Sequence, residues 1–200
     1  MKLNNMNKKI IKIDVDGVLR DMLSAMCNIY NAVYNDNIQP CNIKNYDIDI
    51  SFPKCKEVDG ISAKYFFFNE MVYEVYHCAK VLPKAKEAID ILHNLGYYII
   101  IVTNQESYLN RHDTLAWLDN KNIYYDSICF TDDKSIIKGD IMVDDFIDNL
   151  KQCENNGEEL ICIKAPYNED VDFPKKVPSL YHYARFLETQ EGIKSLDKLK

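Results

Sequence analysis

The chain has 200 residues, of which 47% are hydrophobic and 28% charged, so it can bury a sizeable core and disorder is not expected. Its formal net charge of -7 repels the phosphates of long nucleic acid, which makes DNA or RNA strands poor candidate partners. The seven cysteines form no CxxC pair and their number is odd, which argues against a disulfide framework or a zinc site and favours reduced thiols in a cytoplasmic protein.

The first predicted element is a buried strand over residues 9–15, which ends in two carboxylates. Asp14 and Asp16 lie two positions apart, just before Gly17. Carboxylates this close repel each other, and the repulsion is costly unless a cation joins them. Hard divalent cations prefer oxygen ligands, and Mg²⁺ binds through one or two carboxylates together with water and a substrate phosphate. The pattern therefore predicts a metal-dependent phosphate site.

A long insertion follows this strand. About 80 residues separate it from the next apolar run, 97–103, where a crossover helix needs only a dozen or more. Residues 84–95 have apolar positions on one helical face, with proline before and glycine after them, so they are predicted to form that crossover helix. Residues 20–82 are then predicted to be a small helical cap with a loop-rich middle at 35–60.

The remaining chain alternates strands with helices. Further strands are predicted at 127–131, 140–144 and 159–163, and helices at 107–121, 145–155 and 179–188. Strands that are apolar on both faces indicate an α/β, Rossmann-like parallel sheet of about five strands, covered by helices on both sides. We expect a core of residues 1–19 and 83–190 and a polar C-terminal tail at 191–200 that frays.

No membrane association is expected. The N-terminus has no apolar signal core, and the longest apolar stretch, at 97–102, is far too short to span a bilayer. The six glycines form neither a P-loop nor a dinucleotide fingerprint, so no ATP-binding loop and no NAD are predicted.

Polar residues end four of the predicted strands. Thr103 and Asn104 end the second, Lys134 follows the third, and Asp144 and Asp145 end the fourth. Ligands bind at the carboxyl ends of the strands in such sheets, so we expect these residues to gather at one edge with the two N-terminal aspartates. A second lysine, at position 138, precedes the fourth strand and should lie at the opposite edge.

These motifs resemble a known superfamily. The sequences DVDGVL at 14–19, IVTNQ at 101–105, Lys134 and VDD at 143–145 are similar, in this order, to the four motifs of haloacid dehalogenase-like phosphatases. The position of the cap and the sequence APYN at 165–168 more closely resemble the 5'(3')-deoxyribonucleotidases and their bacterial and phage relatives.

The resemblance implies a mechanism. Asp14 would attack phosphorus and form an aspartyl-phosphate, and Asp16 would protonate the leaving alkoxide and then activate water. Phosphate binding would fall to Gly17, Thr103, Asn104 and Lys134. The expected cofactor is Mg²⁺, held by Asp14, the carbonyl of Asp16 and an acid of the fourth motif, where the family favours Asp145 with Asp144 in support. The residues alone do not distinguish these two acids.

The cap is expected to select the substrate. The candidate specificity residues are Met22, Tyr46, Tyr65, Phe66, Phe67 and Phe68, although most of the aromatic run 65–68 is expected to pack inside the cap. Met22 stands where the deoxyribonucleotidases tend to carry an aromatic residue, and no second phosphate-binding lysine occurs at 108–116, where only Arg111 could serve.

The leading hypothesis is a Mg²⁺-dependent phosphomonoesterase whose small phosphorylated substrate is a deoxynucleoside monophosphate. The alternatives are a phosphatase for sugar phosphates or polynucleotide ends, and a relative that binds nucleotide without catalysis. The resemblance also implies a homodimer. Base, sugar and the choice between 5' and 3' esters stay open.

Overall fold

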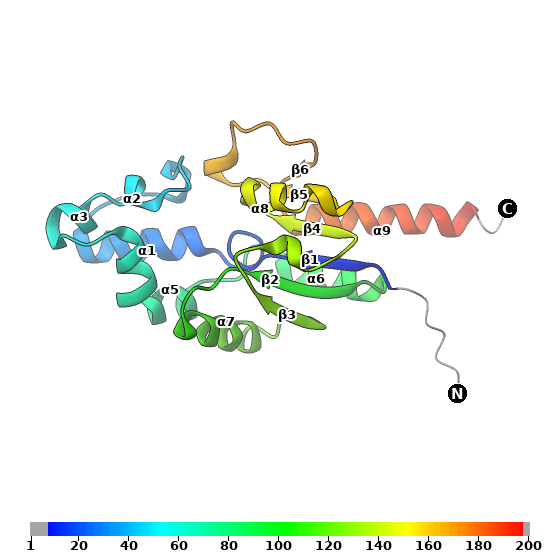
Figure 1. Ribbon diagram of the computed structural model, residues 1–200, viewed down its shortest axis with the longest axis horizontal. Coiled ribbons are helices and arrows are strands. Elements are labelled where there is room, and N and C mark those ends of the chain that lie inside the picture. The colour runs from blue at the N-terminus through cyan, green and yellow to red at the C-terminus, as the bar shows by residue number, and fades with distance from the viewer. Residues whose placement is uncertain (1–7, 198–200) are drawn as a thin grey trace.

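The computed structural model describes the backbone of residues 8–197 and the side chains of residues 8–192. Its centre is a six-stranded sheet in the order β3-β2-β1-β4-β5-β6, in which all neighbouring strands are parallel (Figure 1). The strands are β1 (Ile10–Ile13), β2 (Tyr98–Thr103), β3 (Ser127–Phe130), β4 (Ile141–Asp144), β5 (Glu159–Ile163) and β6 (Lys176–Val177). The α/β parallel sheet is confirmed, with one strand more than expected, because two residues are too few to produce an apolar pattern.

Helices cover both faces of the sheet. One face carries α6 (Ala85–Asn94) and α9 (Leu180–Asp197), which pack against each other, and the buried Trp117 and Leu118 of α7 (Tyr108–Asn120) belong to the same core. The other face carries α8 (Ile147–Gln152), which packs on β4 and β5. The crossover helix predicted at 84–95 is therefore α6.

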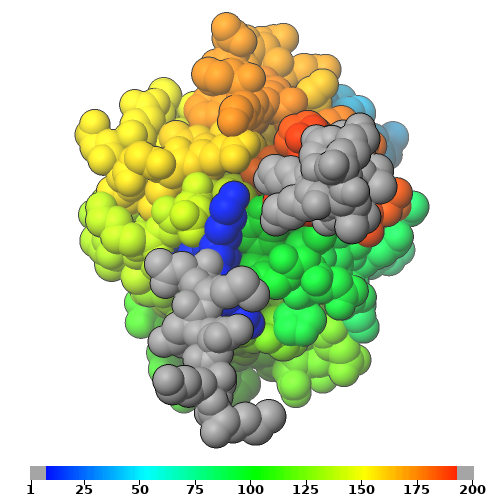
Figure 2. Space-filling model, turned by 90° about the vertical axis from the view of Figure 1, so that its right-hand side faces the viewer, coloured from blue at the N-terminus to red at the C-terminus, as the bar shows by residue number. Residues whose placement is uncertain are grey.

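The register of the strands explains the core. Ile11 pairs with Ile99 of β2 and with Ile141 of β4, and all three side chains are buried on the α6 side. Strand residues alternate between faces, so Lys12 points to the α8 side, where it is fully buried. Its ammonium group pairs with Glu158 at 2.8 Å, which offsets the desolvation of both charges. In Figure 2 the blue start of β1 lies between the green and yellow parts of the chain, as its central place in the sheet requires.

The insertion between β1 and β2 forms a separate helical layer with its own apolar core, at the far end of the molecule from α9 (Figure 1). Its elements are α1 (Met22–Tyr34), η1 (Pro40–Asn42), α2 (Ile48–Ser51), α3 (Lys54–Asp59), α4 (Ala63–Tyr65), the π-helical turn η2 (Phe66–Glu70) and α5 (Val72–Cys78). The middle at 35–60 is thus more helical than predicted. Its two α-helices of four and six residues are too short to show a helical period.

Two paired linkers join this cap to the sheet. The amide of Asp21 donates to the Lys80 carbonyl at 2.9 Å, and the amide of Leu82 donates to the Leu19 carbonyl at 2.8 Å. Between them Arg20 forms an antiparallel bridge with Val81. The chain therefore enters and leaves the cap through one narrow two-stranded connection.

The remaining short helices lie in core loops: η3 (Lys134–Ile136), η4 (Glu154–Asn156) and η5 (Pro166–Asn168). The C-terminal tail differs from its prediction, since α9 continues through residues 191–197, and positions 198–200 lie outside the described residues. Across residues 8–197, none of the helices has the length and apolar character needed to cross a membrane.

Candidate active site

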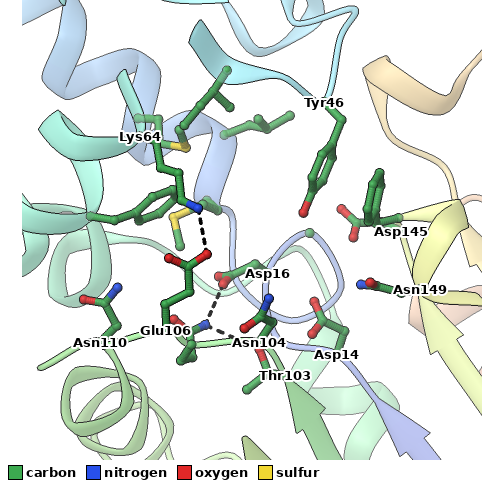
Figure 3. Close-up of a pocket in the computed structure, with 18 of the residues that line it drawn as sticks. Asp14, Asp16, Tyr46, Lys64, Thr103, Asn104, Glu106, Asn110, Asp145 and Asn149 are labelled. Atoms are coloured by element: carbon green, nitrogen blue, oxygen red, sulfur yellow. Dashed lines mark hydrogen bonds and ion pairs between the residues drawn. The ribbon is translucent and has the colours of Figure 1, made fainter. Parts of the chain in front are cut away.

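A cavity of about 520 Å³ lies between the cap and the carboxyl ends of β1, β2 and β4. The strand order reverses at β1, whose neighbours β2 and β4 carry the chain outward in opposite directions, and such switch points form the ligand crevice of doubly wound sheets. The predicted site residues that line it are Asp14, Asp16, Gly17, Met22, Tyr46, Phe68, Thr103, Asn104, Lys134, Asp144 and Asp145. Figure 3 labels six of them: Asp14, Asp16, Tyr46, Thr103, Asn104 and Asp145.

Lys134 is the buried cation at the floor of the cavity. Its ammonium group donates to Asp14 Oδ1 and to Asp144 Oδ2, both at 2.6 Å. Burial disfavours its charge, but these two carboxylates more than offset that effect and raise the pKa of Lys134. Lys138, the alternative considered from sequence, is exposed and donates to Asn156. The structure therefore places Lys134, and not Lys138, with the other motifs.

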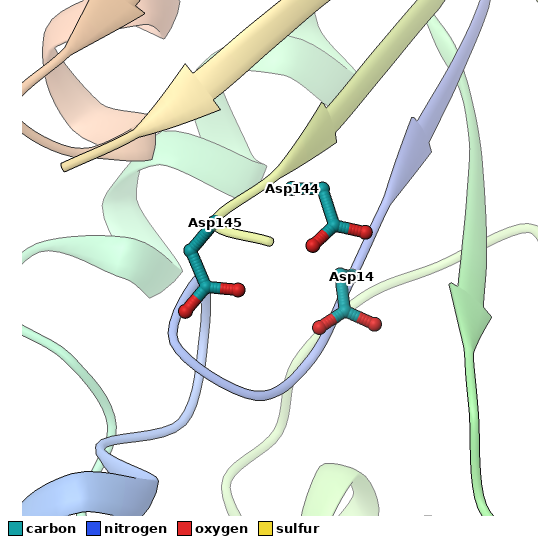
Figure 4. Close-up of side chains that lie close together, drawn as sticks. All are labelled: Asp14, Asp144 and Asp145. Carbon is teal, nitrogen blue, oxygen red and sulfur yellow. The ribbon is translucent and has the colours of Figure 1, made fainter. Parts of the chain in front are cut away.

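Three carboxylates surround this cation. Asp14, Asp144 and Asp145 each offer an oxygen within 4.8 Å of the others (Figure 4). Burial, and secondarily the charge of Asp144, raises the pKa of Asp14 to about 7 against the opposing effect of Lys134. Burial and the other two carboxylates also hold the pKa of Asp145 well above its ordinary range. One ammonium cannot balance three buried carboxylates, so the cluster has the charge and the all-oxygen donors that suit a hard divalent cation such as Mg²⁺.

The two acids of the fourth motif differ in their hydrogen bonds. Asp144 accepts from the Lys134 ammonium, the Phe146 amide at 2.9 Å and the Asn149 side chain at 3.0 Å. Asp145 accepts from the Tyr167 hydroxyl, and within the described chain its other oxygen has no donor. Asp145 therefore keeps a free lone pair toward the cavity, whereas Asp144 is occupied in holding its neighbours.

Gly17 lets the backbone pass close to this cluster. Its φ angle is +77°, a left-handed conformation that glycine adopts without strain. A Cβ atom here would overlap the carboxylate of Asp145. Both the backbone conformation and the space therefore require glycine at this position.

Thr103 and Asn104 end β2 beside the aspartates. Thr103 is buried, whereas Asn104 is exposed toward the cavity. Arg111, the candidate second phosphate ligand, does not line the cavity; its side chain donates to the carbonyl of Gln105 at 2.8 Å and so holds this loop from behind. Within the described residues Arg111 therefore contacts the loop backbone and not the cavity, because α7 turns its side chain toward the Gln105 carbonyl.

The Asp16 carboxylate points away from that of Asp14 (Figure 3). It accepts two hydrogen bonds from the guanidinium of Arg20, at 2.6 and 3.1 Å, and one from Gln105 Nε2 at 3.0 Å. Both donor residues are buried.

The cap supplies the upper wall of the cavity. The ring of Tyr46 stacks on Phe146 of the core with 3.5 Å between ring centroids, and Lys64 pairs with Glu106 at 2.7 Å across the opening (Figure 3). Of the aromatic run, Phe68 alone lines the cavity. Phe66 and Phe67 pack in the cap core, as expected for most of this run, and Tyr65 is an exposed residue outside the cavity lining, so of the four candidates only Phe68 remains a candidate specificity residue.

Sequence reasoning missed the residues that hold the motif side chains in place: Arg20, Tyr76, Gln105, Asn149 and Tyr167. Tyr167 belongs to APYN, whose only signal in the sequence is its resemblance to the deoxyribonucleotidases, and the adjacent Asn168 donates to the Asp145 carbonyl at 2.7 Å. A charged Arg20 beside an apolar strand was the one signal available for its buried role.

Comparisons with known proteins agree with this geometry. The family model described as "5' nucleotidase, deoxy (Pyrimidine), cytosolic type C protein" matches residues 8–185. The chain is 30% identical over 156 residues to the 5'(3')-deoxyribonucleotidase of Clostridium acetobutylicum, covering 76% of this chain and 81% of the relative. It is 26% identical over 167 residues to that of Bacillus subtilis, covering 82% and 89%.

Solved structures show the same fold at low sequence identity. A haloacid dehalogenase-like hydrolase from Streptococcus pneumoniae superposes with a TM-score of 0.56 at 13% identity, covering 90% of this chain and 98% of its own. A predicted phosphoglycolate phosphatase from Haemophilus somnus superposes with a TM-score of 0.58 at 15% identity, covering 92% and 100%.

Proposed function

This chain belongs to the cytosolic type C family of deoxyribonucleotide 5'-nucleotidases, and from that premise we propose that it hydrolyses deoxynucleoside monophosphates through a phosphorylated Asp14. Family membership makes it a phosphoric monoester hydrolase of the 5'-nucleotidase type, and its fold is that of the haloacid dehalogenase-like hydrolases. The observation that carries the proposal is the buried contact of Lys134 with both Asp14 and Asp144 at the switch point of the sheet.

In the first step, a carboxylate oxygen of Asp14 attacks phosphorus. The ester P–O bond breaks, and the leaving alkoxide takes a proton from the Asp16 carboxyl group. Lys134 donates to Asp14 in the free enzyme and offsets negative charge as the phosphoryl group arrives. The Thr103 hydroxyl and the Asn104 side chain, at the end of β2, would hold the phosphoryl oxygens.

In the second step, water attacks the phosphorus of the aspartyl-phosphate. Its proton passes to the Asp16 carboxylate, and the P–O bond to Asp14 breaks. Inorganic phosphate leaves, and both aspartates return to their starting protonation states. One residue thus serves first as acid and then as base.

The acidic cluster supports a Mg²⁺ site. Asp14, Asp145 and the backbone carbonyl of Asp16 would hold the ion, with Asp144 supporting Asp14 through Lys134. When bound, Mg²⁺ would offset the charge of the phosphate and lower the repulsion among the carboxylates.

The cavity supports a small substrate. Its volume of about 520 Å³ is in the range typical of small-molecule sites, and its upper wall combines apolar and aromatic side chains with amides. Such a wall suits the flat, partly polar base of a nucleotide. The seven cysteines are all free, which supports a reducing, cytoplasmic setting.

The test is phosphate release from a panel of ribo- and deoxyribonucleoside 5'- and 3'-monophosphates, sugar phosphates and a 3'-phosphorylated oligonucleotide, with and without Mg²⁺. We expect turnover of deoxynucleotides that needs Mg²⁺ and is absent in Asp14→Asn. Turnover of sugar phosphates alone would retain the mechanism and overturn the substrate class. Wild-type protein that releases no phosphate from any ester, yet is stabilised by nucleotide, would indicate a binding protein.

A further inference from the structure

Arg20 is a fully buried arginine beside the cavity that no part of the proposed mechanism uses. Its guanidinium lies 4.4 Å from the ring centroid of Tyr76 and 5.2 Å from that of Trp117, and it donates to the Thr114 hydroxyl at 3.2 Å. Its Nη1 atom is buried and has no hydrogen-bond acceptor within residues 8–192. Burial of a guanidinium is unfavourable unless a strong partner offsets it.

That partner is Asp16. The guanidinium contacts both carboxylate oxygens, from Nε to Oδ1 at 2.6 Å and from Nη2 to Oδ2 at 3.1 Å. This two-point geometry fixes the plane of the carboxyl group as well as its position, which a lysine ammonium cannot do. The third donor, Gln105, contacts the same Oδ2 atom.

Tyr76, on helix α5 of the cap, contacts both of the side chains that donate to Asp16. Its ring covers the guanidinium of Arg20, and its hydroxyl donates to Gln105 Oε1 at 2.6 Å. Both side chains that hold Asp16 therefore rest on one cap residue. The backbone of Arg20 lies in the linker, where it bridges Val81.

We propose that Arg20 is the positioning residue that sets the orientation of the Asp16 carboxyl group for proton transfer and ties that orientation to the position of the cap. The inference rests on the proposed function, because it takes Asp16 as the acid and base of phosphoester hydrolysis. Arg20 itself touches neither phosphorus nor the leaving group. Its loss affects the steps that move a proton and spares those that do not.

The decisive experiment compares two leaving groups in Arg20→Lys, which keeps the positive charge and removes the two-point contact of the guanidinium with the Asp16 carboxylate. A deoxynucleoside 5'-monophosphate has an alkoxide leaving group that needs a proton, whereas the nitrophenolate of p-nitrophenyl phosphate leaves without one. Misplaced acids lower rates steeply, so we expect kcat for the nucleotide to fall about 10- to 100-fold. KM and the rise in Tm caused by Mg²⁺ stay unchanged.

The aryl ester reports the two steps separately. In Arg20→Lys we expect a rapid burst of nitrophenolate, equal in amount to the enzyme, followed by slow turnover. Attack by Asp14 needs no proton transfer with this substrate, but activation of water by Asp16 still does. The burst also counts folded active sites, so a poorly folded variant cannot imitate the expected result.

Two further variants guard the interpretation. Thr114→Val removes one contact of the guanidinium and keeps its charge, so it should show a smaller loss of the same kind. Arg185→Lys changes an exposed arginine of α9 that pairs with Glu188, and should behave as wild type.

The inference is overturned if Arg20→Lys slows the burst of nitrophenolate as strongly as it slows nucleotide turnover at unchanged Tm, or if it slows the turnover of neither ester. It is also overturned if both rates fall in proportion to lost folded protein, since a purely structural cation behaves in that way. A wild-type enzyme that hydrolyses no phosphate ester would overturn the proposed function, and the inference with it.

Discussion

The floor of the cavity and its mouth are held together in opposite ways. At the floor, Lys134 is buried between Asp14 and Asp144. At the mouth, Lys64 and Glu106 form an ion pair in which both side chains are more than half exposed to water. Removing one partner of a buried ion pair destabilises the folded protein strongly, whereas an exposed ion pair contributes only about 0 to 1 kcal/mol to its stability. The floor is therefore built for fixed geometry, and the mouth can rearrange around different substrates.

The largest effect is expected at the floor of the cavity, where the ion pairs are buried. Lys134→Met leaves two buried carboxylates without their cation, so we expect the free energy of unfolding to fall by about 3 to 5 kcal/mol and phosphate release to vanish. Chemical denaturation and the phosphate assay measure the two effects. The matched control is Lys138→Met, which removes an exposed lysine and should leave both unchanged. Normal activity in Lys134→Met would contradict the proposed role of the floor.

A second prediction tests whether the carboxylates at the floor of the cavity bind a metal ion. Saturating Mg²⁺, at about 100 times its Kd, should stabilise the wild type by about 2.7 kcal/mol. Asp145→Asn should lose most of this stabilisation, because it removes a charged oxygen ligand that, unlike Asp144, accepts no hydrogen bond from the Lys134 ammonium group. Thermal unfolding with and without Mg²⁺ measures the difference. Asp148→Asn, an exposed acid nearby on α8, is the control, and equal losses in the two variants would place the metal elsewhere.

A third prediction concerns the aromatic contact at the mouth. Tyr46→Ala removes the ring that stacks on Phe146, a contact worth about 0.5 to 1.5 kcal/mol. We expect KM for nucleotides to rise by less than about tenfold and their order of preference to change, with kcat nearly constant. Steady-state kinetics over the nucleotide panel measures this. A collapse of kcat with unchanged KM would instead place Tyr46 in the chemistry.

The smallest effect is expected at the exposed ion pair. Lys64→Ala should change the free energy of unfolding by at most about 0.5 kcal/mol and should weaken the dependence of KM on salt concentration. Unfolding curves and KM values at low and high salt measure both quantities. A loss of several kcal/mol would show that the mouth is as rigidly built as the floor.

The same division explains what the sequence could predict. Thr103 and Asp144 end apolar strands, Asp14 follows one directly and Lys134 follows one after a short loop, and the parallel sheet alone brings these strand ends to one edge. The resemblance correctly led to a nucleotidase family, as the comparisons show. The placement of these four residues in the cavity follows from their positions at or after the carboxyl ends of parallel strands, and apolar runs locate those ends well.

The contacts around these motifs were not predictable in the same way. The pairing of Arg20 with Asp16, or of Tyr167 with Asp145, depends on side-chain directions in irregular loops that no periodic pattern encodes. The aromatic run 65–68 was ambiguous because its residues lie in α4 and a π-helical turn, where the usual helical spacing does not apply. Short elements such as α2 and β6 carry too few residues to produce a signal.

The paired linkers have a consequence for how this enzyme could be remodelled. The chain enters the cap at Asp21 and leaves it at Lys80, and the backbones of these two residues are joined by a hydrogen bond of 2.9 Å. A segment whose two ends lie side by side can be replaced by a tight turn or by a cap from another protein, because either bridges the same short distance with little loop-closure entropy cost. The cap could thus be exchanged to change substrate preference without disturbing the strands of the sheet.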